Sequence, residues 1–260
     1  MWTEENTELL KKLYPYETKD NLLKSFDWCN WESLKKYANK NGVKRDKTLF
    51  LITRKGTLEP LLYEEMSSYY WIGFIAADGC FYDNKYHFSI VCSKKDKEHL
   101  LKLSKLLETS LHKTKEERPS DIKYKKYSQK GKYGYRISLK HKVPFLKIME
   151  KFDFHFKKTY NPPDFNKYLN FTNDQLFSIL IGLIDGDGNI SKWQNITIVC
   201  HKSWGKFYID LLDRLSIQYR KTMTKNGYFS VRLKKDVYLK LKKVAISLNL
   251  PLMERKWFKV

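Results

Sequence analysis

The sequence predicts an α+β protein in which two similar halves follow a small all-α module. Three observations lead to this prediction. The apolar segment WIGFIAADG at residues 71–79 returns as LIGLIDGDG at residues 180–188. The same order of helical and strand-like segments follows each copy, and the first 46 residues carry only helical patterns. Because two repeats are too few for an open solenoid, we expect a closed pair of pseudo-symmetric halves, each with an antiparallel sheet.

Residues 1–46 are predicted to form three short helices. WTEENTELLKKLY begins behind a Thr3 cap, TKDNLLKSF follows, and NWESLKKYANKNG begins behind Asn30 and ends at Gly42. The stretch resembles the Myb-like or homeodomain-like modules that often begin W-T/S-x-E-E, which implies a helix-turn-helix reader of the major groove. The third helix would then present Lys35, Lys36 and Lys40 to DNA. The alternative is a packing appendage whose lysines are merely solvated.

The remaining chain is predicted to be a linker and two repeats. Residues 47–66 alternate weakly, contain Gly56 and Pro60, and are assigned as a linker that packs partly on the next segment of the chain. The first repeat covers residues 67–165 and the second covers residues 166–260. Similar segments in the two repeats, SIVCSK with TIVCHK and ISLK with VRLK, indicate an internal duplication. Each half should run helix, strand pair, helix, strand pair, helix.

The charge of the chain points to a polyanionic partner. Fifty Lys and Arg against 29 Asp and Glu leave a net charge of +21 in 260 residues, which makes nucleic acid the first candidate. No run approaches the ~18 to 20 apolar residues of a membrane-spanning helix, and the N-terminus lacks a signal-peptide pattern. The four cysteines are scattered, which argues against a zinc site and a disulfide framework. We therefore expect an intracellular, reducing compartment rather than secretion, and no membrane partner.

The two copies of the apolar segment are predicted to pack against each other. Small residues recur on one stripe of each helix and would let the two backbones approach closely. These seam residues are Gly73, Ala76, Gly182 and Gly186.

Both apolar helices are predicted to end at an acid, Asp78 and Asp187, followed by Gly79 and Gly188 in a left-handed C-terminal conformation. A carboxylate is unfavourable at a helix C-terminus, so something positive must compensate. If the helices cross, the two acids come close together and a divalent cation beside them is expected, with Mg²⁺ best suited to few protein ligands. Asp185 matches Ala in the other copy and is expected to be structural.

These residues resemble the paired LAGLIDADG motifs of homing endonucleases in the single-chain, two-repeat form. The resemblance covers about residues 67–260. It implies a saddle whose curved sheets lie along the major groove, while the motif acids meet the minor groove. The implied chemistry is hydrolysis of one phosphodiester on each strand with a short 3′ stagger, dependent on Mg²⁺, for which Mn²⁺ should substitute.

The resemblance also assigns site residues. The metal ligands it implies are Asp78, Asp187 and the carbonyls of Ala77 and Gly186. The other catalytic residues it implies are Ser93 and His201 on the first strand pairs, and Lys140 and Lys234 on the second. Ser93 and His201 differ in chemistry, so the two pockets are expected to be unequal.

A DNA-binding surface is predicted on the strands of each repeat, where alternate side chains face one side. The candidates are Lys123, Lys125, Arg136 and Ser138 in the first repeat and Gln194, Asn195, Arg220, Thr222, Thr224 and Arg232 in the second. A basic insertion in the first repeat indicates an asymmetric target.

The sequence therefore favours a monomeric, site-specific endonuclease that acts on double-stranded DNA. The alternative is a protein on the same scaffold that binds without cutting, either an intron maturase or a DNA-binding regulator. Maturase activity could coexist with cleavage, with intron RNA as a further partner. A nucleic-acid packaging protein is disfavoured because it needs no paired acids.

Overall fold

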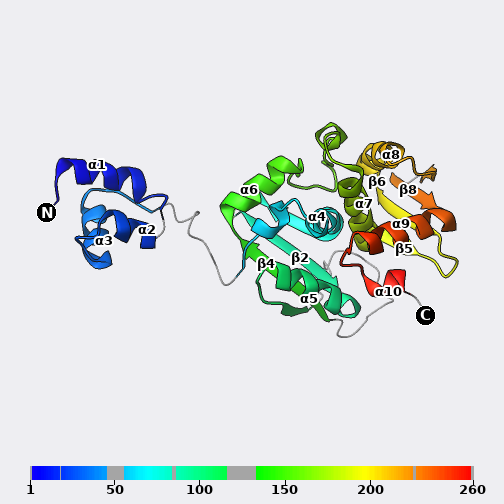
Figure 1. Cartoon of the computed structure of the whole chain (residues 1–260), viewed down its shortest axis with the longest axis horizontal. Coiled ribbons are helices and arrows are strands. Elements are labelled where there is room, and N and C mark those ends of the chain that lie inside the picture. The colour runs from blue at the N-terminus through cyan, green and yellow to red at the C-terminus, as the bar shows by residue number, and fades with distance from the viewer. Residues whose placement is uncertain are drawn as a thin grey trace. The chain divides into compact units, whose positions relative to one another are not determined.

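The computed structural model describes residues 2–17, 19–45, 56–83, 86–115, 133–224 and 227–258. The chain divides into two compact units, Met1–Ile52 and Thr53–Val260 (Figure 1). Residues 47–55 of the predicted linker lie outside the described residues. The residues after them pack on the larger unit, where Leu58 and Leu61 are buried.

The smaller unit contains three helices, α1 (Glu4–Leu13), α2 (Lys19–Ser25) and α3 (Trp31–Lys40). The expected caps are present, because the side chains of Thr3 and Asn30 accept hydrogen bonds from Asn6 N and Ser33 N. The three helices enclose a small core of their own, made of Leu10, Tyr14, Leu22, Phe26, Leu34, Ala38 and Val43. Trp2 closes one side by stacking on Tyr37 with ring centroids 3.7 Å apart.

The larger unit consists of two repeats with the same element order. The first repeat contains α4 (Met66–Asp78), β1 (Gly79–Tyr82), β2 (His87–Ser93), α5 (Lys97–Leu106), β3 (His112–Lys115), β4 (Tyr133–Lys140) and α6 (Lys142–Lys151). The second contains α7 (Asn173–Asp187), β5 (Gly188–Ile190), β6 (Ile196–His201), α8 (Gly205–Arg214), β7 (Arg220–Met223), β8 (Tyr228–Leu233), α9 (Lys235–Ser247) and α10 (Glu254–Trp257). Short 3₁₀ turns precede α4, α5, α7 and α8.

Each repeat forms a four-stranded sheet in which every pair is antiparallel, with orders β1-β2-β4-β3 and β5-β6-β8-β7. The predicted α+β class with one antiparallel sheet in each half is confirmed. One face of each sheet supplies the core, as Phe88 and Ile90 on β2 and Ile137 on β4 illustrate. Val91 and its cross-strand neighbour Arg136, which adjoin Ile90 and Ile137 in sequence, face outward.

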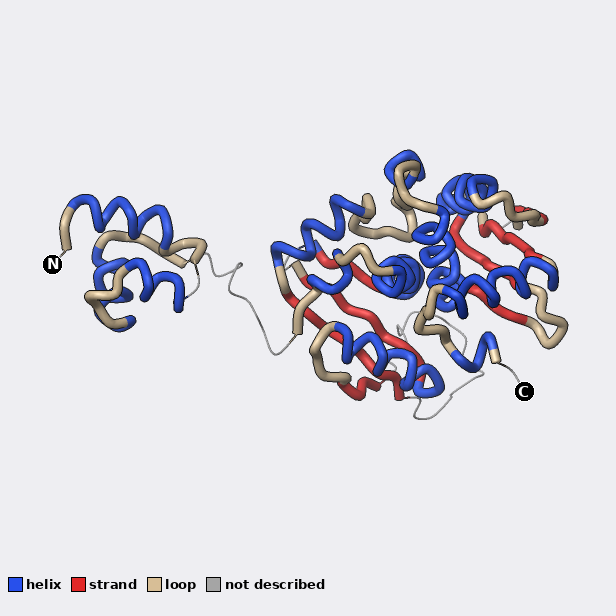
Figure 2. Tube along the Cα trace, in the orientation of Figure 1, coloured by secondary structure: helices blue, strands red, loops and turns tan. Residues whose placement is uncertain are grey.

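Helices α4 and α7 lie side by side between the two sheets (Figure 2). Glycine makes this crossing possible. A Cβ at Gly73 would lie 2.0 Å from Ile179 O, and one at Gly182 would lie 2.0 Å from Tyr70 O. A Cβ at Gly186 would lie 2.2 Å from Ala77 Cβ. The two backbones are thus in direct contact along the stripe of small residues, which no larger side chain would permit.

The predicted left-handed conformation after each acid is wrong. Gly79 (φ −75°, ψ 160°) and Gly188 (φ −79°, ψ 147°) are extended, because the chain passes from each helix straight into the first strand of its sheet. Glycine is needed there for a different reason. A Cβ at Gly79 would lie 2.7 Å from Ile75 O, and one at Gly188 would lie 2.5 Å from Ile184 O.

Candidate metal site at the helix crossing

The crossing of α4 and α7 brings their terminal acids together. Asp78 and Asp187 are both open to solvent, and a Cβ at Gly186 would lie 3.6 Å from the Asp78 carboxyl carbon. Partial desolvation and the charge of Asp187 raise the pKa of Asp78 to about 6, against the opposing effect of Lys158 and Lys256. Desolvation also raises the pKa of Asp187. Two mutually repelling carboxylates in one place are suited to a divalent cation.

Each motif helix is also capped by a lysine that the sequence analysis missed. Lys158 Nζ donates to Ala76 O at 2.5 Å and to Ala77 O at 2.6 Å, at the end of α4. Lys256 Nζ donates to the main-chain oxygens of Asp185 at 2.6 Å and Gly188 at 2.6 Å, and more weakly to those of Ile184 and Gly186, at the end of α7. These ammonium groups satisfy the C-terminal carbonyls and offset the negative helix ends.

The two lysines also interact with the acids electrostatically. Burial lowers the pKa of Lys158, and the charges of Asp187 and Asp78 oppose this effect. Burial likewise lowers the pKa of Lys256, and Asp185 and Asp78 oppose it. Part of the positive charge that we expected from a metal ion therefore comes from the protein itself.

A signal for both lysines was present in the sequence. In each repeat a left-handed residue, Asp153 or Asn249 (φ 49° in both), stands two residues after the end of the third helix, α6 or α9. A short connection follows, and the four-residue segments HFKK and MERK end at Lys158 and Lys256. The two lysines therefore stand at matching places in the repeats. Neither lysine lies in a strand, so the alternating pattern that marks a strand residue does not mark it.

The assignment of Lys140 and Lys234 to the pockets of the acids is wrong. Lys140 pairs with His87 at the start of β2, whereas the residue after Asp78 pairs with Ile90. Lys140 is therefore displaced by about three residues, or ~10 Å, along the sheet. Lys234 follows β8 and lines a different hollow. The reason is that β4 and β8 run antiparallel to the strands beside them, so their C-terminal ends point away from the crossing.

Ser93 and His201 lie at the same end of their sheets as the acids. His201 lines a hollow of about 290 Å³ together with Asp187, Lys158 and Tyr160, and its Nδ1 lies 2.9 Å from Ser203 Oγ. Ser93 Oγ instead donates to Asp96 Oδ2 at 2.8 Å. The two pockets are therefore chemically unequal.

The donor set at the crossing fits a hard divalent cation with few protein ligands. In the part of the chain that the structure describes, no group of three or more His, Cys, Asp and Glu side chains is placed to hold a metal. Asp78 and Asp187 supply carboxylate oxygens, and Mg²⁺ takes its remaining ligands from water and phosphate. The carbonyls of Ala77 and Gly186, predicted as ligands, accept hydrogen bonds from Lys158 and Lys256.

The predicted DNA-binding residues on the strands are mostly exposed. Arg136 lies on the outer face of β4, while Ser138 Oγ lies 2.6 Å from His87 Nε2. Lys123 and Lys125 lie outside the described residues. In the second repeat Arg220 and Arg232 are cross-strand neighbours. The other exposed candidates of the second repeat are Asn195, Thr222 and Thr224, and Gln194 is half-buried in the β5–β6 turn.

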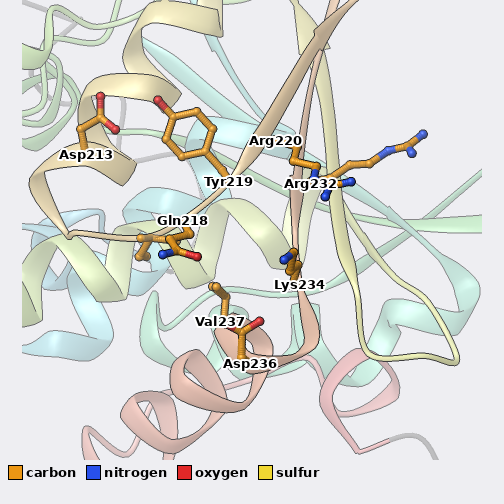
Figure 3. Close-up of a pocket in the computed structure, with 9 residues that line it drawn as sticks. Asp213, Gln218, Tyr219, Arg220, Arg232, Lys234, Asp236 and Val237 are labelled. Carbon is orange, nitrogen blue, oxygen red and sulfur yellow. The ribbon is translucent and has the colours of Figure 1, made fainter.

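Arg220, Arg232 and Lys234 line a hollow of about 460 Å³ beside β7 and β8, which Asp213 and Asp236 also border (Figure 3). The two arginines come from neighbouring strands, Arg220 from β7 and Arg232 from β8. This hollow shares no lining residue with the one that Asp187 and His201 line.

On α3 of the smaller unit, Lys36 and Lys40 are exposed. Lys35 is half-buried and forms an ion pair with Glu32 at 2.8 Å. The helix therefore presents two lysines and a partly neutralised third.

The fold and the site together define a two-repeat α+β protein whose paired acids lie at a glycine-lined helix crossing between two antiparallel sheets. No protein-family model matches the sequence, and the sequence is not significantly similar to that of any curated protein. No helix among the described residues is long and apolar enough to cross a membrane.

Several solved structures are similar to this one, and the descriptions of two of them name the homing endonucleases I-DmoI and I-WcaI. I-DmoI in complex with DNA and Ca is 14% identical, with a TM-score of 0.43 over 69% of this chain and 90% of that one. The homing endonuclease I-WcaI bound to its DNA recognition sequence is 11% identical, with a TM-score of 0.48 over 76% of this chain and 89% of that one. The K262A mutant of I-SmaMI is 15% identical, with a TM-score of 0.42 over 70% of this chain and 85% of that one.

Proposed function

We propose that this protein is a site-specific DNA endonuclease of the homing type. It makes a metal-dependent double-strand cut with short 3′ overhangs at a long, asymmetric site. The observation that carries the proposal is the meeting of Asp78 and Asp187 at the crossing of α4 and α7, with a lysine at the end of each helix. Both acids come from one chain, so we infer that it acts as a monomer.

The acids would hold Mg²⁺, for which Mn²⁺ can substitute. The cation would lower the pKa of an attacking water and neutralise charge on the scissile phosphate. Asp78 and Asp187 would hold the cation only in their ionised form, which the two lysines favour.

Lys158 and Lys256 would stabilise the transition state. Lys158 uses two ammonium hydrogens on Ala76 and Ala77, which leaves a third for a phosphate oxygen. Lys256 is 6% exposed and directs its hydrogens to main-chain oxygens, so it acts through its charge. A fixed cation beside the phosphate offsets the negative charge that grows as the water attacks.

The two sheets would bind the DNA on either side of the acids. Their exposed faces carry Arg136 on β4 in one repeat and Arg220 on β7 and Arg232 on β8 in the other, and the net charge of +21 supplies a strong non-specific attraction. The unequal outer faces suit an asymmetric target. We propose that the smaller unit adds a further contact through α3, as a helix-turn-helix module does.

A cleavage selection tests this proposal. The full chain is incubated with a library of randomised duplexes in Mg²⁺, and new double-strand ends are captured and sequenced. We expect staggered ends at one long, asymmetric sequence in Mg²⁺ and none in EDTA. Binding of a specific duplex with no cut in Mg²⁺ or Mn²⁺ would instead favour a non-cleaving binder, either a regulator or an intron maturase.

A further inference from the structure

The motif helices carry the same terminal acid but differ in the turn before it. Asp185 of α7 is 1% exposed, whereas the equivalent position of α4 is Ala76. Asp185 accepts three hydrogen bonds: from Tyr70 Oη to Oδ2 at 2.6 Å, from Met253 N to Oδ2 at 2.9 Å, and from Trp257 Nε1 to Oδ1 at 2.7 Å. Both carboxylate oxygens are therefore used, and the donors come from α4 and from the C-terminal segment.

Two of these donors lie on the segment that carries Lys256. Met253 and Trp257 flank the lysine on either side, so the Asp185 side chain holds both ends of the segment. The main-chain oxygen of Asp185 also accepts from Lys256 Nζ at 2.6 Å. One residue therefore fixes the position of the ammonium group and supplies a negative charge beside it.

Lys158 is held in a different way. The main-chain oxygen of Lys158 accepts from Trp204 Nε1 at 2.9 Å, and that of Thr159 accepts from Ser203 Oγ at 2.8 Å. An indole N–H thus supports each lysine-bearing segment. On the Lys256 side it reaches a buried carboxylate, and on the Lys158 side it reaches the backbone of the lysine itself.

The two lysines lie at the ends of different motif helices. Lys158, at the end of α4, lines the hollow that contains Asp187 and His201. Lys256 is not part of that hollow and donates to the end of α7. A change that displaces one lysine should therefore affect one pocket.

We propose that Asp185 is a positioning residue for Lys256, and that its loss slows the cleavage of one DNA strand while sparing the other. The strand-specific part rests on the proposed endonuclease function. Misplacing a catalytic group by about 1 Å can cost on the order of 100-fold in rate. Because the Lys158 side does not depend on Asp185, its strand should be cut at nearly the wild-type rate.

The test uses the full chain and the duplex recovered in the cleavage selection, with a different fluorophore on each strand. Asp185→Asn keeps the shape of the side chain and removes its charge. Trp257→Phe and Trp204→Phe are matched variants that each delete one indole N–H, on the Lys256 and Lys158 sides respectively. Single-turnover rates are measured for each strand in Mg²⁺, and duplex affinity is measured in EDTA.

We expect Asp185→Asn to lower the cleavage rate of one strand by roughly 10- to 100-fold. The cleavage rate of the other strand and the duplex affinity should stay within about threefold of wild type. Trp257→Phe should lower the cleavage rate of the same strand by a smaller factor, and Trp204→Phe should lower the cleavage rate of the opposite strand. Equal slowing of both strands in Asp185→Asn, or no slowing of either, would overturn the proposal.

A second measurement does not depend on cleavage. Lysine acylation followed by mass spectrometry compares the reactivity of Lys256 and Lys158 in the free protein. Asp185→Asn should raise the reactivity of Lys256 about threefold or more through local opening, and leave Lys158 unchanged. If the wild type cuts no duplex, the proposed function fails, and the acylation result alone decides whether Asp185 positions Lys256. Unchanged reactivity of Lys256 would refute that role.

Discussion

At the residue scale, the main feature is the pair of lysines that end α4 and α7. An ammonium group at a helix C-terminus meets both the orphan carbonyls and the negative end of the helix dipole. Lys158 and Lys256 do this within the surroundings of Asp78 and Asp187. They therefore stabilise the ionised acids, and in the proposed reaction they also stabilise the phosphate in the transition state.

Replacing Lys158 by Met should lower the single-turnover rate of the strand cut at its pocket by about 100-fold or more, because a fixed charge beside the phosphate is removed. Lys140→Met is the matched comparison, since Lys140 lies away from the crossing. We expect it to weaken duplex binding at most, with the rate at saturating protein within about threefold of wild type. The reverse order of effects would restore the assignment made from the sequence.

The buried His99 gives a prediction about pH. Burial lowers the pKa of His99 from 6.5 to about 3, so between these values the unfolded chain binds a proton that the folded chain does not. The stability contributed by neutral His99 is complete above pH 6.5 and falls with pH by up to ~1.4 kcal/mol per unit.

His99→Gln carries no titrating group at this position. The gap in unfolding free energy between the wild type and this variant should therefore narrow by about 2 kcal/mol from pH 6.5 to pH 5. Urea unfolding of the larger unit at several pH values measures the gap, and the acids common to both proteins cancel. A gap that stays constant over this range would show that His99 is not held neutral.

At the element scale, the duplicated motif and its small residues were sufficient to predict the crossing helices, the strand pairs and their antiparallel pairing. Apolar periodicity and glycine spacing are local patterns, and they carry that information. The position of Lys140 depends on which end of β4 lies near the crossing. The direction of β4 within the sheet determines this, and a local sequence pattern does not reveal that direction. Lys158 and Lys256 follow irregular connections, where periodicity gives no signal.

The crossing itself is expected to be intolerant of a single added carbon. In Gly73→Ala the new Cβ would have to displace Ile179 O, 2.0 Å away, so α4 and α7 must separate. We expect a loss of at least about 2 kcal/mol in unfolding free energy for the larger unit. Ser67→Ala, in the first turn of the same helix, should change it by less than about 0.5 kcal/mol. Equal effects of the two substitutions would show that the helices do not touch at Gly73.

At the scale of the whole molecule, two units with separate cores share one basic chain. The smaller unit has its own core of Leu10, Phe26, Leu34 and neighbouring residues, and its helix α3 exposes Lys36 and Lys40. Of the +21 charge, residues 1–52 carry +2, from ten Lys and Arg against eight Asp and Glu, and residues 53–260 carry the remaining +19. The proposed cutting centre lies entirely within the larger unit, so binding strength and cutting position should be separable.

Removing residues 1–52 should weaken duplex binding and shorten the protected footprint, while the cut stays at the same bond. The dependence of log affinity on log salt should become shallower by about 0.9 for each phosphate that the shorter protein no longer neutralises. Footprinting and a salt titration measure both effects. An unchanged footprint and salt slope would show that the smaller unit does not bind the duplex.

The central claim is that Asp78 and Asp187 together form a metal-dependent cutting centre. The most direct test is single-turnover cleavage of the selected duplex in Mg²⁺ by the wild type, Asp78→Asn and Asp187→Asn. We predict a staggered double-strand cut by the wild type, and a loss of at least about 100-fold in double-strand cleavage for each variant, with duplex affinity retained. Cleavage of both strands at the wild-type rate by either variant would contradict the claim.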